Sequence, residues 1–302
     1  MIDVIIPTHN HEPYIEQAVN SVLEQDQSLI NAVLVCDDHS TDRTAEIVNH
    51  LAKNSNGKIR HIRREKNLGR CRNLQLAVLD SQSAYIALLE GDDYWCYPDK
   101  LRRQFDRLEE DRAIVASCHS LLYHDLKNDS LHHMFKQFSN SHKWEGLIDI
   151  AKELQILSTF AHVNSLLVRT AVLQKIFTID MSEIYLYDIL INWRIHDFGE
   201  VYYHDFIGAV YRAFAQNSYS NHAQNDKIGE FLKSTNSIYP YLVKHRGSLS
   251  DHVLDILLNC FSSSPQDFEK FMATLEYYKS KYPMVLETVS SEKIIHKFAQ
   301  PE

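Results

Sequence analysis

Short apolar runs alternate with amphipathic stretches over the first hundred residues. Runs that are apolar at successive positions are typical of strands buried on both faces. Three such runs lie at residues 4–6, 32–36 and 85–89, and residues 58–63 predict a weaker strand whose only aliphatic residues are Ile59 and Ile62. Between them, apolar residues recur at the spacing of a helix with one buried stripe, as in Ile15, Val19 and Val22. The order βαβαβαβ predicts an α/β fold, in which helices cover both faces of a mainly parallel sheet.

The later part of the chain has a different pattern. Residues 163–168 and 200–212 resemble strands, and the polar stretch 127–141 predicts a loop. Beyond about residue 216 the apolar positions recur at helical spacing, and Ser264-Pro265 is a typical helix start. We therefore expect an α/β domain over residues 1–215 and a helical C-terminal extension over residues 216–302, which packs on the first domain or forms homo-oligomers.

Composition excludes several classes of protein. The chain has 302 residues, of which 44% are hydrophobic, so it buries a core and is not dominated by disorder. Lys and Arg number 31 against 40 Asp and Glu, and the net charge of −9 argues against nucleic acid as a partner. The five cysteines are widely spaced and form no CxxC pair, which indicates reduced thiols rather than disulfides or a zinc site.

The N-terminus and the hydropathy pattern bear on location. An acidic residue, Asp3, lies where a signal peptide would carry basic residues. No apolar run approaches the roughly 18 residues that a membrane span needs. The sequence therefore predicts a soluble, cytoplasmic protein and leaves open a peripheral association with the membrane surface.

Polar residues follow three of the predicted strands directly. They are Pro7-Thr8-His9-Asn10, Asp37-Asp38 and Glu90-Gly91-Asp92-Asp93. Ligands of parallel α/β sheets bind beyond the carboxyl ends of the strands, so these side chains are expected to share one site. Five carboxylates at one sheet edge repel one another unless a cation lies among them, and oxygen ligands suit Mg²⁺ or Mn²⁺.

Each acidic pair taken alone has a simpler explanation. Asp37-Asp38 would serve as a turn before a helix, and residues 90–93 as a solvated turn. Their combination with a polar end of the first strand favours a functional site instead. The sequence lacks the G-x-G-x-x-G turn of dinucleotide-binding enzymes and the G-x-x-x-x-G-K-[ST] loop of P-loop proteins, so both classes are excluded.

Four ordered segments together resemble the motifs of the family 2 glycosyltransferases, which have the GT-A fold. The segments are Val4–Asn10, Cys36–Asp42, Asn67-Leu68-Gly69 with Asn73, and Glu90–Trp95. The resemblance spans about residues 1–110 and continues more weakly to about residue 213. It implies metal-dependent inverting transfer of a sugar from a nucleotide-diphosphate donor, with a UDP-sugar favoured. The implied acceptor is a glycan or glycolipid of surface polysaccharide synthesis, and the implied cofactor is Mn²⁺ or Mg²⁺.

The resemblance also implies roles for individual residues at the donor side. Asp92 would hold the metal, Glu90 the ribose or a metal-bound water, and Asp38 the N–H of a pyrimidine base. The full set of nucleotide-binding candidates is Pro7, Thr8, His9, Asn10, Asp37, Asp38, Asn67, Gly69, Arg72, Glu90, Gly91 and Asp92. Gly91 also indicates an unusual φ or a close approach of the backbone, because glycine is scarce in this chain.

The candidates at the acceptor side come from two segments of the chain, residues 93–95 and residues 183–188. Asp93, Trp95 and Glu183 are expected on the wall of the acceptor pocket, and Asp188 is expected to be the catalytic base. Packing inside the fold is the alternative role for Trp95 and the commoner one for tryptophan. Glu183 is the alternative base, and a helix N-cap is the alternative role for Asp188. The chain departs from the family where Tyr211-Arg212 is followed by Ala213 instead of a histidine.

Two other functions stay open at this point. One is a nucleotidylyltransferase-like enzyme on the same scaffold, which the lack of a Gly-rich phosphate loop after the first strand disfavours. The other is a non-catalytic protein that binds nucleotide sugars.

Overall fold

The computed structural model describes residues 1–134, 145–148, 161–216, 221, 224–241, 246–258, 265–286, 289 and 291–299. These residues form two compact units. Unit 1 comprises Met1–Ile148, Ala161–Ser182 and Ile195–His222. Unit 2 comprises Asp149–Phe160, Glu183–Arg194 and Ala223–Glu302. The division therefore assigns residues 183–194 to the C-terminal unit, whereas the sequence pattern places them in the first domain.

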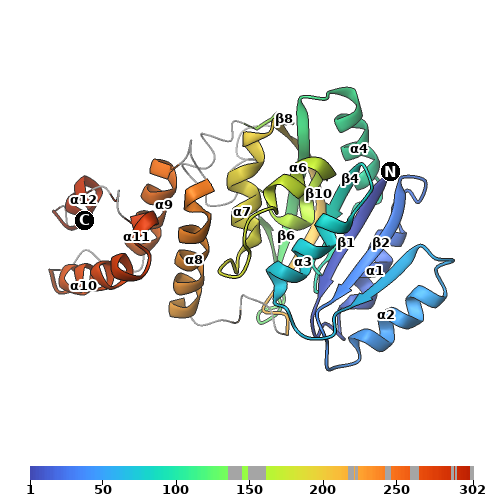
Figure 1. Ribbon diagram of the computed structural model, residues 1–302, viewed down its shortest axis with the longest axis horizontal. Helices are drawn as coiled ribbons and strands as arrows, with labels where there is room; N and C mark the ends of the chain where they lie inside the picture. The colour runs from blue at the N-terminus through green and yellow to red at the C-terminus, as the bar shows by residue number, and fades with distance from the viewer. Residues whose placement is uncertain are drawn as a thin grey trace. The chain divides into compact units, whose positions relative to one another are not determined.

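Unit 1 is built on one sheet, in which ten strands are described (Figure 1). Eight strands follow one another in the order β3 (Ile59–Arg63), β2 (Ile30–Asp37), β1 (Ile2–Thr8), β4 (Tyr85–Leu88), β9 (Leu167–Arg169), β6 (Ile114–Asp125), β10 (Glu200–Ala213) and β5 (Tyr94–Trp95). Two further strands, β7 (Ser130–Met134) and β8 (Gly146–Leu147), pair with β6 and β10.

Strand directions bring the carboxyl ends of six strands to one edge. β3, β2, β1 and β4 are parallel neighbours, as are β6 and β10. The short strand β9 is antiparallel to both β4 and β6, so β6 and β10 run in the same direction as β4. The expected α/β fold with a mainly parallel sheet is confirmed.

Helices pack around this sheet, and their apolar stripes face the core. They are α1 (Ile15–Leu23), α2 (Thr44–Lys53), α3 (Arg70–Asp80), α4 (Lys100–Glu110) and α6 (Thr170–Ile176). The predicted stripe of α1 is confirmed, because Ile15, Val19 and Val22 are fully buried, and the helix packs on β1 and β5. β1 is buried along its whole length, which explains its continuous apolar run.

Two segments differ from the sequence expectation. Residues 163–168 begin as a 3₁₀ helix, η2 (Val163–Ser165), and only the last part belongs to strand β9. The polar stretch 127–141 contains β7, while its residues 135–141 lie outside the described residues. Strand β6 lacks the continuous apolar run that predicts a buried strand, because some of its buried side chains are polar, among them Ser117 and His119.

Unit 2 is helical in the residues that the structure describes. Its helices are α7 (Tyr187–Arg194), α8 (Gln224–Ile238), α9 (Arg246–Leu258), α10 (Pro265–Lys281), α11 (Pro283–Leu286) and α12 (Ser291–Ala299). Leu232, Leu254 and Phe271 are buried in this unit, as the helical spacing of apolar residues predicts. None of the helices described here is long and apolar enough to cross a membrane.

A buried histidine lies on β10 in unit 1. His204 has 2% of its surface exposed, and its Nδ1 lies 3.1 Å from Oε1 of Glu145. Burial lowers the pKa of His204 to about 4, although Glu145 favours the charged imidazolium. The folded chain therefore holds this histidine neutral at a pH where the unfolded chain protonates it.

We expect the free energy of unfolding to fall as the pH is lowered from about 6.5 to about 4, since the unfolded state binds the proton first. His204 contributes at most about 3 kcal/mol to this loss. His204→Phe, which is uncharged at every pH, should reduce the loss in urea-unfolding measurements across this range. His50→Gln, at an exposed histidine of α2, is the control. Equal acid sensitivity of wild type and His204→Phe would contradict the assignment.

Candidate active site

Asp37, at the carboxyl end of β2, is completely buried and supports the loop that follows it. Its Oδ1 accepts the main-chain N–H of Ser40 at 2.8 Å. Its Oδ2 lies 3.4 Å from Nε2 of His61 and 3.6 Å from Nε of Arg63. Burial by itself would raise the pKa of Asp37, but hydrogen bonds from His61 and Ser40 outweigh it and hold the pKa below its usual value. Asp37 is therefore an ionised acid that fixes the loop.

Asp38 joins three segments at the same edge. Its main-chain N–H donates to the carbonyl of Thr8, the last residue of β1, at 2.9 Å. Its Oδ1 accepts the N–H of Leu68 at 2.7 Å. No residue that the structure describes donates a hydrogen bond to its Oδ2. Asp38 therefore has one carboxylate oxygen committed to the fold and one available to a ligand.

The other predicted residues at this edge hold the loops together. Asn10 has a φ of 56°, which asparagine tolerates well, and its Oδ1 accepts the N–H of Thr41 at 2.7 Å. The side-chain amide of Asn67 lies 3.3 Å from Nε2 of His9. Asn67 also accepts, through Oδ1, the N–H of Gly69 at 2.9 Å. Four of the nucleotide-binding candidates thus lie on loops at this edge, His9 and Asn10 after β1 and Asn67 and Gly69 after β3.

Two arginines of α3 differ in what they contact. Arg70 forms an ion pair with Glu90, with Nη2 and Oε1 separated by 3.0 Å. Arg72, one of the nucleotide-binding candidates, donates instead to Oε1 of Gln75 at 2.5 Å. The structure therefore connects Arg70, and not Arg72, to the acidic turn that follows β4.

That turn, residues 90–95, contains three acids in different surroundings. Glu90 is engaged by Arg70, and its main-chain N–H donates to Oδ1 of Asn164 at 2.8 Å. Asp92 is only 8% exposed, yet its carboxylate accepts no hydrogen bond from any described residue. The carbonyl of Asp92 accepts a hydrogen bond from Nη1 of Arg212 at 2.7 Å. The main chain of Asp92 is therefore fixed, while its carboxylate has no hydrogen-bond partner among the described residues.

Asp93 is completely buried, and this corrects its expected place on a pocket wall. Its Oδ1 accepts the main-chain N–H of Arg212 at 2.6 Å, and its Oδ2 accepts the amide of Asn164 at 2.5 Å. Burial, followed by the charge of Asp92, raises the pKa of Asp93 well above its usual value. Both oxygens are occupied inside the fold, so this side chain has no surface to offer a substrate.

Trp95 also lies inside the fold, which corrects the second expected wall residue. Its side chain is 3% exposed, and its Nε1 donates to the carbonyl of Asn164 at 2.9 Å. The ammonium of Lys100 lies 4.1 Å from the centre of the indole ring. The position of Trp95 directly after the acids therefore reflects packing and not an exposed pocket.

No sequence pattern predicts that Asn164 and Arg212 contact this turn. Asn164 lies in an apolar segment, and Arg212 drew notice only because a histidine is missing after it. Arg212 is 7% exposed, its guanidinium lies 4.5 Å from the ring centre of Tyr94, and it also donates to Gln17. Only the fold, which brings η2 and β10 beside the turn, reveals these contacts.

Gly91 is required by a close approach of the backbone. Its N–H donates to the carbonyl of Pro7 at 3.1 Å, so the turn lies directly on the end of β1. A Cβ at position 91 would lie 2.7 Å from Oγ1 of Thr8 and 2.8 Å from Nδ1 of His11. Of the two explanations that the sequence offers for this glycine, the structure supports the close approach.

Asp188 and Glu183 lie in unit 2. Asp188 is the second residue of α7, and its Oδ1 accepts the N–H of Ile189 at 3.0 Å. Glu183 is an exposed residue whose carboxylate lies 2.7 Å from Nζ of Lys233. The catalytic role of Asp188 and the acceptor-side role of Glu183 stay predictions.

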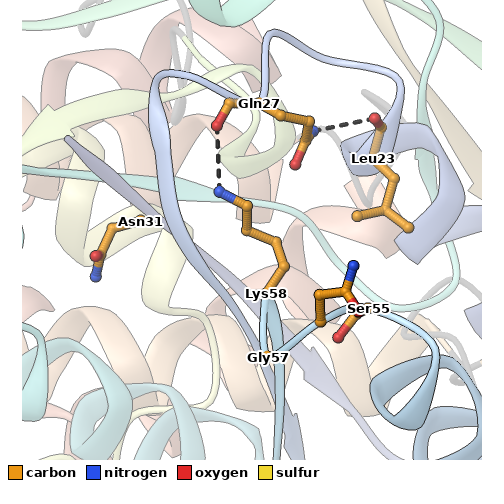
Figure 2. A pocket seen from close by; sticks show the side chains of 7 residues that line it. Leu23, Gln27, Asn31, Ser55, Gly57 and Lys58 are labelled. Atoms are coloured by element: carbon orange, nitrogen blue, oxygen red, sulfur yellow. Dashed lines mark hydrogen bonds between the residues drawn. The ribbon is translucent and has the colours of Figure 1, made fainter.

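A separate surface hollow lies at the opposite edge of the sheet, near the start of β2 and β3 (Figure 2). Its volume is about 460 Å³. It is lined by Leu23, Gln27, Asn31, Ser55, Asn56, Gly57 and Lys58. The ammonium of Lys58 donates to the carbonyls of Gln27 at 3.2 Å and Ile30 at 2.7 Å, so its charge stabilises the loop beside it. None of the predicted site residues lines this hollow.

We expect Gly91→Ala to destabilise the chain by about 1–3 kcal/mol, because the added methyl group overlaps two buried side chains that have little room to move. Gly146→Ala is the matched control, since a Cβ at position 146 meets no atom within 4 Å. Urea unfolding of the two variants measures the difference. Equal stability of both variants would contradict the close approach.

Comparisons with known proteins agree with this architecture. A family model described as "Glycosyl transferase family 2" matches residues 3–177. An uncharacterized glycosyltransferase, alr2836, of Nostoc sp. is 28% identical over 202 residues, which cover 67% of this chain and 58% of that protein. TuaG of Bacillus subtilis, provisionally named a teichuronic acid biosynthesis glycosyltransferase, is 33% identical over 126 residues, which cover 41% of this chain and 49% of TuaG. The chain thus spans less than two thirds of the length of these relatives.

Two solved structures are similar in fold. TarS of S. aureus, residues 1–349 with UDP-GlcNAc, is 18% identical with a TM-score of 0.69, and the match covers 97% of this chain and 85% of that one. The mannosyltransferase PcManGT of Pyrobaculum calidifontis, with GDP-Man and Mn²⁺, is 15% identical with a TM-score of 0.56, covering 99% and 74%. The family match extends over more than half of the sequence and includes the strands and loops that carry Asp38 and Asp92. The chain therefore belongs to glycosyl transferase family 2.

Proposed function

We propose that this chain is a metal-dependent inverting glycosyltransferase, which moves a sugar from a nucleotide-diphosphate donor to a glycan or glycolipid acceptor. The observation that carries the proposal is the pair Asp38 and Asp92 on either side of the end of β1. The carbonyl of Thr8 accepts the N–H of Asp38, and the carbonyl of Pro7 accepts the N–H of Gly91, next to Asp92. Each acid has at least one carboxylate oxygen that no described residue occupies.

The donor in this proposal is a UDP-sugar. Asp38 accepts the N–H of the pyrimidine through Oδ2, since its Oδ1 is held by Leu68. Pro7, Thr8 and His9 at the end of β1 and Asn67 in the loop after β3 surround the base. TarS binds UDP-GlcNAc, which supports this choice of nucleotide, and the name of TuaG supports a role in surface polysaccharide synthesis.

The acidic turn fits a divalent cation. Of its three acids, Glu90 is engaged by Arg70 and Asp93 is buried with two donors, which leaves Asp92 as the carboxylate that would bind Mn²⁺ or Mg²⁺. The described residues contain no cluster of three or more His, Cys, Asp or Glu side chains that suits a metal. A single protein carboxylate is common where substrate phosphates and water complete the shell. Such a cation neutralises charge that develops on the leaving diphosphate.

The protein residues supply orientation and proton transfer. Arg70 holds Glu90, which in this proposal contacts the ribose or a metal-bound water, and Arg212 fixes the main chain of Asp92. Asp188 stays the proposed base that takes the proton of the acceptor hydroxyl, with Glu183 as the alternative. A cytoplasmic location, peripheral membrane association and self-association through the C-terminal helices stay predictions.

Isothermal titration of UDP with and without Mn²⁺ tests the donor site. Asp92→Asn should remove the gain in UDP affinity that Mn²⁺ gives to the wild type. Asp38→Ala should weaken UDP binding by about 10- to 100-fold under both conditions, because it removes a hydrogen bond to a charged group. Asp26→Asn, an acid paired with Arg102 away from this edge, is the control and should bind like the wild type. A wild type that binds neither UDP nor GDP with Mn²⁺ would contradict the proposed function.

A second experiment tests the base. Asp188→Asn keeps the shape of the side chain and most of its capping ability, but it cannot accept a proton. We expect UDP binding to persist while UDP release from a panel of UDP-sugars falls by about 10²- to 10⁴-fold. Glu183→Gln is the matched variant and should retain activity. The reverse result would transfer the role to Glu183.

A further inference from the structure

Asn164 is bound to three different positions of the acidic turn. It is the central residue of η2 and has no exposed surface. Its Oδ1 accepts the N–H of Glu90 at 2.8 Å, and its Nδ2 donates to Oδ2 of Asp93 at 2.5 Å. Its carbonyl accepts Nε1 of Trp95 at 2.9 Å. These bonds lie on both sides of Asp92, although 69 to 74 positions of the chain separate the partners.

Arg212 closes this network around Asp92. The second oxygen of Asp93 accepts the main-chain N–H of Arg212 at 2.6 Å. The guanidinium of the same arginine donates to the carbonyl of Asp92 at 2.7 Å. The carboxylate of Asp92 itself accepts nothing from the described residues. Its position is therefore determined by the main chain of the turn, which Asn164 and Arg212 hold.

The chemistry of an amide is specifically suited to position 164. A side-chain amide offers a donor and an acceptor in one rigid plane. Here the donor meets the carboxylate of Asp93, and the acceptor meets the N–H of Glu90. An aspartate at position 164 would keep the acceptor but would face Asp93 with a second oxygen at hydrogen-bond distance. The hydrogen bond to Asp93 would then have a donor only if one of the two acids bound a proton.

We propose that Asn164 is a positioning residue, which sets the Asp92 carboxylate for cation binding through its hydrogen bonds to Glu90 and Asp93. The inference rests on the proposed function for the role of Asp92. It adds that a residue of η2, outside every motif of the donor site, determines the affinity of that site for the metal.

Exchanging the two partners tests the proposal. Asn164→Asp places two carboxylates against each other, and Asp93→Asn places two amides against each other. The double variant Asp93→Asn/Asn164→Asp restores the hydrogen bond between positions 93 and 164 with its donor and acceptor exchanged. It keeps an acceptor for the N–H groups of Glu90 and Arg212, and it keeps the net charge. The measured quantity is the apparent dissociation constant of Mn²⁺ at saturating UDP, followed by electron paramagnetic resonance of free Mn²⁺. Thermal unfolding of each variant is measured in parallel.

We expect each single variant to weaken Mn²⁺ binding by about 10- to 100-fold, as changes of residues that orient a metal ligand commonly do. The double variant should recover most of this loss. Should Asn164→Asp fail to fold, Asp93→Asn tests the same hydrogen bond from its other side.

A chemically similar pair at the opposite end of β1 is the control. Nδ2 of Asn31 donates to Oδ1 of Asp3 at 2.8 Å, and Ser81 donates to the other oxygen at 2.7 Å. Asn31→Asp and the double variant Asp3→Asn/Asn31→Asp should change stability without changing Mn²⁺ affinity. This control separates a general loss of stability from a displaced ligand.

Folded single variants with the Mn²⁺ affinity of the wild type would overturn the inference and leave the proposed function in place. A double variant that regains stability without regaining Mn²⁺ affinity would overturn it as well. A wild type that shows no nucleotide-dependent Mn²⁺ binding would overturn the proposed function, and the inference with it.

Discussion

The carboxylate of Asp93 has lost all of its contact with water, and much of the site follows from that constraint. A buried carboxylate is costly unless hydrogen-bond donors replace its hydration. Here one donor comes from β10 and the other from η2, so two distant segments must meet at the turn after β4. The same two segments also bind Glu90, Trp95 and the main chain of Asp92. The buried carboxylate of Asp93 thus fixes the turn that carries Asp92.

The carboxyl end of β2 carries a second buried carboxylate, Asp37, which is stabilised in a different way. Its partners are Ser40 in the loop that follows and the basic side chains of His61 and Arg63 on the neighbouring strand β3. Hydrogen bonds lower the pKa of Asp37, whereas burial raises that of Asp93. One edge of the sheet therefore contains two buried acids whose pKa values are shifted in opposite directions, and each directly neighbours a proposed ligand-binding acid, Asp38 or Asp92, in the chain.

Sequence reasoning predicted the parts of this structure that depend on local patterns. Continuous apolar runs identified the parallel strands β1, β2 and β4, and strand direction then placed the acids of both loops at one edge. Trp95 and Asp93 were misplaced because an aromatic or acidic residue beside a motif has the same local pattern whether it points inward or outward. Asn164 could not be assigned, because its importance arises from three partners that are distant along the chain. Strand β6 was missed for a related reason, since its polar side chains are satisfied only by tertiary contacts.

The order of the strands has a consequence for synthesis of the chain. The contacts that hold Asp38 come from β1, β2 and the segment that ends with Leu68, so they are available early in translation. Strand β4, by contrast, gains its second neighbour only when β9 has emerged, and Asp93 gains its last donor with Arg212. Because chains begin to fold from the N-terminus as they are made, a nascent chain has an open strand edge and an unsatisfied acid at β4 for much of its elongation. The two halves of the site therefore mature at different times, with the half around Asp38 complete first and the half around Asp92 last.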